Sequence, residues 1–171
     1  TSPNPMVGCV IEHEGKIIGE GWHKKAGSSH AEVNAFDTVQ DKSVLVNANV
    51  YVTLEPCSHF GKTPPCSDLI VGKNVNKVFI GCVDSNPIVA KNGIYKLLNA
   101  GIEVVTGILE AECQNINVRF NTNHLLGRPY VVLKWAQSAD FFIDPRKTKN
   151  NSGQVFVSNL QSKVLTHKFR N

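Results

Sequence analysis

The feature that most constrains this chain is the stretch from His30 to Cys66, whose side chains can bind one metal ion. It opens with His30 and Glu32, separated by one alanine, and it ends with Cys57, which follows a proline, and Cys66. One imidazole and two thiolates can hold a zinc ion and leave its fourth tetrahedral position open. Glu32, free of the metal, could then carry protons for a water at that position. Hydrolytic chemistry therefore requires these segments to meet at one point.

The order of these residues matches a known signature only in part. H-x-E followed by P-C-x-x-C is typical of zinc enzymes that deaminate nucleobases, but here eight residues separate the cysteines. Two other interpretations stay open: His30 begins a helix and the cysteines are core residues, or His59 completes a closed structural zinc site. Glu32 argues against the second, because a structural site has no use for a free carboxylate beside its ligand.

Length and cysteine content limit the class of protein. The 171 residues suffice for one compact domain and part of a second. No apolar run approaches the roughly 20 residues of a membrane span, and the first residues do not resemble a signal peptide. The five cysteines are an odd number, and two have metal-ligand spacing, which favours a reducing compartment over a disulfide framework. We therefore expect a cytoplasmic protein without a membrane partner.

The charge is unevenly distributed. Residues 1–127 carry 10 Lys and Arg against 12 Asp and Glu, whereas residues 128–171 carry 8 against 2. This asymmetry suggests two units with different partners. The slightly acidic first unit argues against a polynucleotide substrate, which usually requires a basic surface.

Hydrophobic patterning predicts strands and helices in alternation. Ser28 or Ser29 and then Thr63 could cap helices, and Gly72 and Gly101 could end them. Such alternation implies a layered α/β fold. The expected strands cover residues 7–11, 16–22, 50–54, 77–82 and 102–106, and the expected helices cover residues 30–39, 64–72, 94–98 and 110–126.

The tripeptide at residues 127–129, Gly-Arg-Pro, is the expected domain boundary, giving domains 1–127 and 128–171. In the second domain we expect strands at 130–135 and 155–157, a loop at 145–153 and a helix at 160–169.

Further motifs surround the metal-binding residues. They are P-N-P at 3–5, V-G at 7–8, G-E-G-W-H at 19–23, A-G at 26–27, V-T-L-E-P-C-S-H at 52–59, G-K-T-P-P-C at 61–66 and D-S-N-P at 84–87. Together with H-A-E at 30–32, they closely resemble the deaminase half of the bifunctional riboflavin-biosynthesis deaminase–reductase family. The insertion between the cysteines is itself that family's pattern, and the resemblance covers almost the whole chain.

The resemblance implies a cytidine-deaminase-like three-layer α/β/α fold with a mostly parallel mixed sheet, followed by the start of a second α/β domain. It implies hydrolytic deamination of 2,5-diamino-6-ribosylamino-4(3H)-pyrimidinone 5′-phosphate to 5-amino-6-ribosylamino-uracil 5′-phosphate, with release of ammonia. By match, Glu32 moves protons, and the zinc ligands are His30, Cys57 and Cys66. The matched positions of the substrate pocket are Asn4, His23, His59, Lys62, Asp84 and Asn86.

Beyond Arg128 the chain resembles the start of the NADPH-dependent reductase half, through R-P-Y-V-V-L-K at 128–134 and S-A-D at 138–140. Phe141 stands where the family usually has Gly, and Phe156 where Trp is common. The 44 residues after Gly127 are too few for a nucleotide-binding domain, so we expect no reduction by this chain alone. The matched cofactor or substrate positions are Lys134, Ala136, Gln154, Phe156 and Arg170.

Two alternatives of other classes remain. One is a tRNA or free-base deaminase of the same fold. The other is a non-catalytic binding module that a zinc ion stabilises. The acidic first unit and Lys62, which could bind a phosphate as a point charge, favour a small pyrimidine nucleotide over nucleic acid. Assembly into a homo-oligomer is left open by the sequence.

Overall fold

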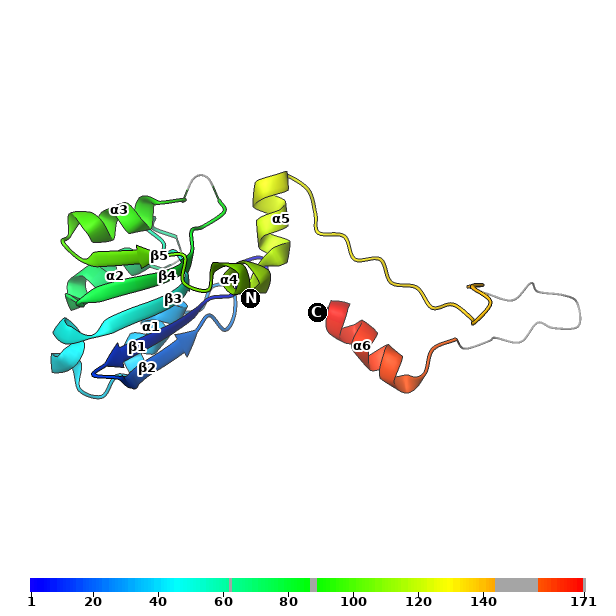
Figure 1. The fold of residues 1–171 in the computed structure, drawn as a ribbon, viewed down its shortest axis with the longest axis horizontal. Coiled ribbons are helices and arrows are strands. Elements are labelled where there is room, and N and C mark those ends of the chain that lie inside the picture. The colour runs from blue at the N-terminus through cyan, green and yellow to red at the C-terminus, as the bar shows by residue number, and fades with distance from the viewer. Residues whose placement is uncertain (62, 87–88, 144–156, 171) are drawn as a thin grey trace, which may run out of the picture. The chain divides into compact units, whose positions relative to one another are not determined.

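The computed structural model describes residues 1–61, 63–86, 89–143 and 157–170, and it separates into two compact units, Thr1–Tyr130 and Val131–Asn171 (Figure 1). Among the described helices, none combines the length and apolarity that crossing a membrane requires.

The first unit is built around a five-stranded mixed sheet with strand order β2-β1-β3-β4-β5. β1 pairs antiparallel with β2 and β3, whereas β3–β4 and β4–β5 are parallel. Glu14 and Gly15 both have positive φ, as a tight hairpin turn requires. The parallel pairs need crossover connections, which helices supply. The strands are β1 (Gly8–His13), β2 (Lys16–Trp22), β3 (Asn49–Leu54), β4 (Lys77–Cys82) and β5 (Glu103–Thr106).

Helices lie on both faces of this sheet, as the three-layer prediction requires. On one face, Phe36, Ile70 and Leu97 pack into a core with Val50 and Ile80. The helices of this unit are α1 (Ala31–Thr38), α2 (Cys66–Lys73), α3 (Asn92–Asn99), α4 (Glu110–Ile116) and α5 (Val118–Leu126), with a short 3-10 turn, η1 (Lys42–Asn47).

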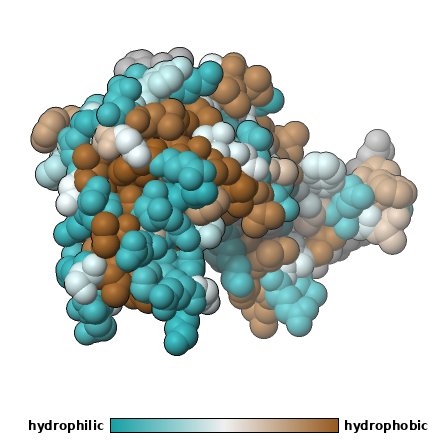
Figure 2. All heavy atoms as spheres, turned by 60° about the vertical axis from the view of Figure 1, so that its left-hand side comes forward, coloured by the Kyte–Doolittle hydropathy of each residue, from teal (hydrophilic) through white to brown (hydrophobic). Residues whose placement is uncertain are grey.

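On the other face, α4 packs closely against Gly81 of β4. A Cβ added at Gly81 would lie only 2.3 Å from Sγ of Cys113 in α4. Figure 2 shows apolar patches interrupted by polar side chains on the face turned to the viewer.

The expected helix caps are wrong in detail. α1 begins after His30, and no side chain caps it; the Ser28 hydroxyl instead bonds within its own turn. α2 begins after Pro65, and the Thr63 hydroxyl lies 3.4 Å from Nε2 of His30. α2 also continues past the expected end at Gly72. Local sequence identified these helices, but Ser28 bonds to the nearby Lys25 carbonyl and Thr63 contacts the distant His30, so neither side chain caps a helix.

The expected single helix over residues 110–126 is two helices, α4 and α5, that meet at Asn117. This side chain is buried, and it both accepts from the Met6 backbone N–H and donates to the Met6 carbonyl, each at 2.7 Å. Its backbone φ of −112° departs from helical geometry. The partner lies 111 residues away, so no local pattern could predict the break.

In the second unit, the predicted strand at 130–135 is wrong, since residues 129–138 form neither helix nor strand. A strand needs a neighbour for its backbone hydrogen bonds, and none is present among the described residues of this unit. The predicted helix is confirmed as α6 (Leu160–Arg170). The predicted loop at 145–153 and most of the predicted strand at 155–157 lie outside the described residues.

Candidate active site

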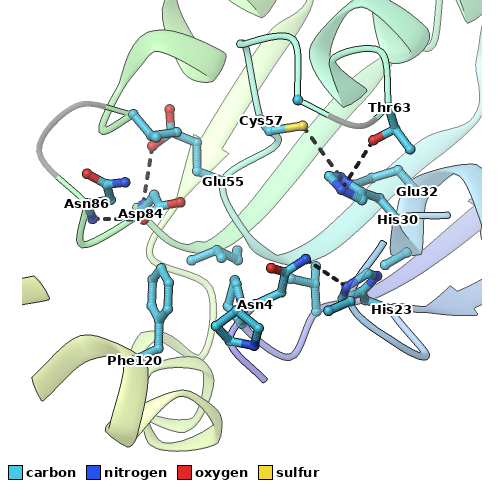
Figure 3. Close-up of a pocket in the computed structure, with 18 of the residues that line it drawn as sticks. Asn4, His23, His30, Glu32, Glu55, Cys57, Thr63, Asp84, Asn86 and Phe120 are labelled. Carbon is cyan, nitrogen blue, oxygen red and sulfur yellow. Dashed lines mark hydrogen bonds between the residues drawn. The ribbon is translucent and has the colours of Figure 1, made fainter. Parts of the chain in front are cut away.

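A cavity of about 570 Å³ lies in the first unit, where β3 and β4 end (Figure 3). Ligands of open α/β sheets commonly bind outside the carboxyl ends of the strands. The segments that line it are far apart in sequence: the N-terminal segment, the residue after β2, the start of α1, the segments after β3 and β4, and α5. The lining includes Asn4, His23, His30, Glu32, Glu55, Cys57, His59, Asp84, Asn86 and Phe120.

Three predicted ligands meet at one side of the cavity. His30 precedes α1, Cys66 begins α2, and Cys57 follows β3; their ligand atoms all lie within 4.8 Å of one another. His30 Nδ1 is 3.5 Å from Cys57 Sγ and 3.2 Å from Cys66 Sγ. Tetrahedral zinc with ordinary bond lengths needs an N–S separation of about 3.6 Å. The donor set therefore fits zinc.

The described residues contain no other His, Cys, Asp or Glu group close enough to bind a metal, and His59 is not part of this one. Glu32 is also outside the group, although it lines the same cavity. A closed structural site completed by His59 is therefore contradicted by the geometry. We call the side formed by His30, Glu32, Cys57 and Cys66 the metal wall.

The pKa values of the two thiols of the metal wall, Cys57 and Cys66, are shifted in opposite directions. The hydrogen bond with the Cys66 side chain, supported by His30 and the Cys66 N–H, lowers the pKa of Cys57 to about 4. Cys66 provides that hydrogen bond and is buried, so its pKa is raised well above the ordinary value. The hydrogen bond with Cys57 likewise raises the pKa of His30. Cys57 is therefore the thiol of the two that loses its proton more readily to become a metal ligand.

Glu32 is suited to proton transfer. It is the second residue of α1, and its side chain is only 3% exposed. Burial, which disfavours the charged form, raises the pKa of this carboxyl above its ordinary value. A general acid–base group works best when its pKa lies near the working pH.

His23 orients Asn4. The His23 ring is buried, and its Nδ1 lies 3.1 Å from the Ser29 carbonyl, which can only accept, so Nδ1 carries the proton. The other nitrogen, Nε2, then accepts from the Asn4 amide nitrogen at 3.2 Å. Asn4 is thereby turned so that its carbonyl oxygen is presented as a hydrogen-bond acceptor (Figure 3).

The other side of the cavity, the distal wall, consists of Asp84, Asn86 and Phe120 (Figure 3). Asp84 Oδ1 accepts from the Asn86 N–H at 2.8 Å. Burial raises the pKa of the Asp84 carboxyl. The half-buried Phe120 ring lies 4.3 Å from the ring of His124.

Sequence reasoning missed Phe120 and Glu55 as lining residues. Phe120 shows no local signal, because its place depends on the break between α4 and α5. Glu55 stands two residues before Cys57, and its position beside the P-C pair was a signal that could have been used.

Other predicted residues lie elsewhere. Lys62, Gln154 and Phe156 lie outside the described residues. In the second unit Lys134 is exposed and Ala136 is half-buried, both in a segment without regular structure. Arg170 ends α6, and its side chain is not among those described. The assignments to a reductase site stay predictions.

Comparison with known proteins adds independent findings. The family model for the cytidine and deoxycytidylate deaminase zinc-binding region matches residues 1–82. "Riboflavin biosynthesis protein RibD" of Aquifex aeolicus is 42% identical over 170 residues, which cover 99% of this chain and 46% of that protein. "Diaminohydroxyphosphoribosylamino-pyrimidine deaminase" of Buchnera aphidicola subsp. Schizaphis graminum is 46% identical over 129 residues, which cover 75% of this chain and 86% of that protein.

The fold has a matching solved structure. RibD of Acinetobacter baumannii, form 1, superposes with a TM-score of 0.89 at 41% identity and covers 99% of this chain and 46% of that one. The chain thus spans about half the length of the Aquifex relative and of this solved structure.

Proposed function

Because the chain belongs to the diaminohydroxyphosphoribosylamino-pyrimidine deaminase family of riboflavin biosynthesis, we propose that it hydrolytically deaminates 2,5-diamino-6-ribosylamino-4(3H)-pyrimidinone 5′-phosphate. The products are 5-amino-6-ribosylamino-uracil 5′-phosphate and ammonia. The observation that carries the proposal is the His30–Cys57–Cys66 group with the buried Glu32 in the same cavity.

His30, Cys57 and Cys66 would hold a zinc ion, which when bound would supply Lewis-acid chemistry that activates water near neutral pH. Glu32 would then transfer the protons. Its carboxylate would accept one proton from the attacking water and give it to the ring nitrogen. It would then pass the second proton of that water to the departing amine, so that ammonia leaves as the ring carbonyl forms. Its burial supports this role, because burial raises the pKa of the carboxyl and so makes it a better proton acceptor than an ordinary carboxylate.

The remaining cavity residues would bind the substrate. The Asn4 carbonyl oxygen can accept from a ring N–H or an amino group, because His23 holds the amide nitrogen. The Asp84 carboxylate can accept from a ribose hydroxyl, and Asn86 beside it offers both a donor and an acceptor. His59 lines the same cavity, and Lys62 is assigned to the phosphate, which it would bind as a point charge.

We also propose that residues 128–171 begin the NADPH-dependent reductase domain of a longer protein. The boundary between the compact units after Tyr130 and the coverage of only 46% of the Aquifex relative support this. The residues present would not by themselves reduce a ribosyl group.

The test combines metal analysis with an ammonia assay. We expect about one zinc per chain and ammonia release from the diaminopyrimidine nucleotide, with little effect of salt. Zinc without turnover would favour the binding module instead. Ammonia release from tRNA or a free base, but not from the nucleotide, would favour the other deaminase class.

A further inference from the structure

The Glu55 carboxylate is a buried acidic group that neither the metal group nor the proton transfer uses. Glu55 follows β3 directly, is 4% exposed, and lines the cavity. Burying a carboxylate is costly unless donors surround it. Its oxygens accept four backbone N–H groups: Oε1 from Gly93 at 2.9 Å and Ile94 at 3.4 Å, and Oε2 from Lys91 at 2.9 Å and Asp84 at 3.3 Å.

Three of these donors belong to the start of α3. Lys91 precedes the helix with a left-handed φ of 67°, and its own side chain provides no cap. The free N–H groups at a helix start carry partial positive charge and favour a carboxylate. Glu55, which lies just past the end of β3, therefore caps α3 although the two are at least 36 residues apart in the sequence.

The start of α3 also contacts the chain that leads to Cys57. A Cβ at Gly93 would lie 1.9 Å from the carbonyl oxygen of Pro56, so only glycine permits this approach. On its other side, the Cys57 carbonyl accepts from the Ser67 N–H of α2 at 3.0 Å. The segment of Pro56 and Cys57 is thus held by both helices.

The fourth donor, the Asp84 N–H, belongs to the distal wall. Asp84 in turn fixes Asn86 through the hydrogen bond between its carboxylate and the Asn86 N–H. One carboxylate thus contacts Asp84 in the loop after β4 and stands two residues before Cys57 (Figure 3).

We propose that Glu55 is a positioning residue for the reaction. Its carboxylate fixes Asp84 and Asn86 against the strand end that carries Cys57, and it thereby sets the spacing between the distal wall and the metal wall. This proposal rests on the proposed function, in which the two walls hold opposite ends of one substrate.

The test is Glu55→Gln, which keeps the size of the side chain but turns an accepting oxygen into a donating amide facing backbone N–H groups. We expect KM for the diaminopyrimidine nucleotide to rise about 10- to 100-fold, because small misplacements of binding groups have effects of this size. kcat should stay within about threefold, since Glu55 does not contact the reacting atoms. Glu103→Gln, at an exposed position of β5, makes the same chemical change and should leave both constants nearly unaltered.

A second measurement does not depend on turnover. In Glu55→Gln, hydrogen exchange should accelerate at the amides of residue 84 and residues 91–94, while the zinc content stays that of the wild type. Gly93→Ala should raise KM similarly without any change of charge, because the added methyl displaces Pro56. Gly72→Ala in α2 is its control, because an added Cβ there meets nothing within 4 Å.

Two results would overturn the proposal. One is a KM within twofold of the wild type together with unchanged exchange. The other is a parallel loss of kcat and zinc without a selective rise in KM, which would indicate a general role in folding. A wild-type protein that releases no ammonia would instead refute the proposed function, and the exchange experiment would still decide whether Glu55 holds the loop.

Discussion

The metal wall and the distal wall of the cavity are built in different ways. His30 directly precedes α1, Cys66 begins α2, and Cys57 lies three residues after the end of β3, each within a short sequence motif. Asp84 and Asn86 lie in the loop after β4, and Phe120 lies on α5, which the break at Asn117 separates from α4.

This difference suggests that the metal wall serves the reaction, whereas the distal wall serves substrate binding. The metal wall must hold three ligand atoms within a few ångströms, so short motifs at element ends specify it. The distal wall is held by contacts between distant segments: Glu55 to the Asp84 N–H, and the Ser85 hydroxyl to the Asn121 side chain at 3.0 Å. Changes in the metal wall should therefore affect kcat and metal binding, whereas changes in the distal wall should affect KM.

The largest effect is expected from Glu32→Gln, which removes the proton carrier of the metal wall. kcat should fall by about 10²- to 10⁴-fold, while zinc stays bound because Glu32 is not a ligand. Ammonia release and metal analysis measure the two. Asp37→Asn, an exposed acid on the same helix, should leave kcat nearly unchanged. Turnover near the wild-type rate in Glu32→Gln would show that another group moves the protons.

Cys66→Ser should abolish tight zinc binding and lower the thermal stability. Zinc that binds only the folded state at 100 times its Kd contributes about 2.7 kcal/mol, and its loss should lower Tm by roughly 5–10 °C. Thermal unfolding with and without a chelator measures this, and the variant should not respond to the chelator. Cys113→Ser, a cysteine outside the metal group, should keep its zinc. Full zinc content in Cys66→Ser would remove Cys66 from the ligand set.

A smaller effect is expected in the distal wall from Phe120→Ala. Aromatic contacts contribute about 0.5–1.5 kcal/mol beyond area, so KM should rise roughly 2- to 10-fold with kcat nearly constant. Steady-state kinetics with the nucleotide substrate measures both constants. Leu125→Ala on the same helix, at a side chain that is 67% exposed and does not line the cavity, is the matched control. A loss confined to kcat would mean that the two walls do not divide their roles in this way.

The smallest effect concerns stability. Burial raises the pKa of Asp84, so the folded chain holds this proton more tightly than the unfolded chain. Ionisation therefore destabilises the fold as pH rises from the ordinary pKa of 3.8 through the raised value, and the penalty is complete above it. Asp84→Asn removes the penalty and keeps an acceptor for Asn86.

We expect Asp84→Asn to have a higher Tm than the wild type near pH 7, with the difference disappearing towards about pH 4. Thermal unfolding across this pH range measures it, and Asp37→Asn should show no such trend. A variant less stable than the wild type at neutral pH would indicate that the Asp84 carboxylate is held by favourable charge interactions rather than merely buried.

Much of the fold was predictable because hydrophobic spacing is local. All five strands of the first unit were expected close to their observed ends, and Cys9 of β1 and Cys82 of β4 lie in the buried core. The strand expected at 130–135 is wrong for a physical reason. Alternating apolar residues favour a strand only when a neighbouring strand accepts their hydrogen bonds and covers one face.

The sequence by itself determined the chemistry of the metal wall: an imidazole, two thiols and a nearby carboxylate occur in an order whose meaning depends only on side-chain type and spacing. Tertiary structure alone decided the break at Asn117, the cavity position of Phe120 and the contacts of Glu55. Each depends on a partner that lies far away in the chain, 111 residues away for Asn117 and Met6. Folding brings such partners together through the packing of the whole sheet. Short sequence patterns cannot predict these contacts, because each pattern covers only neighbouring residues.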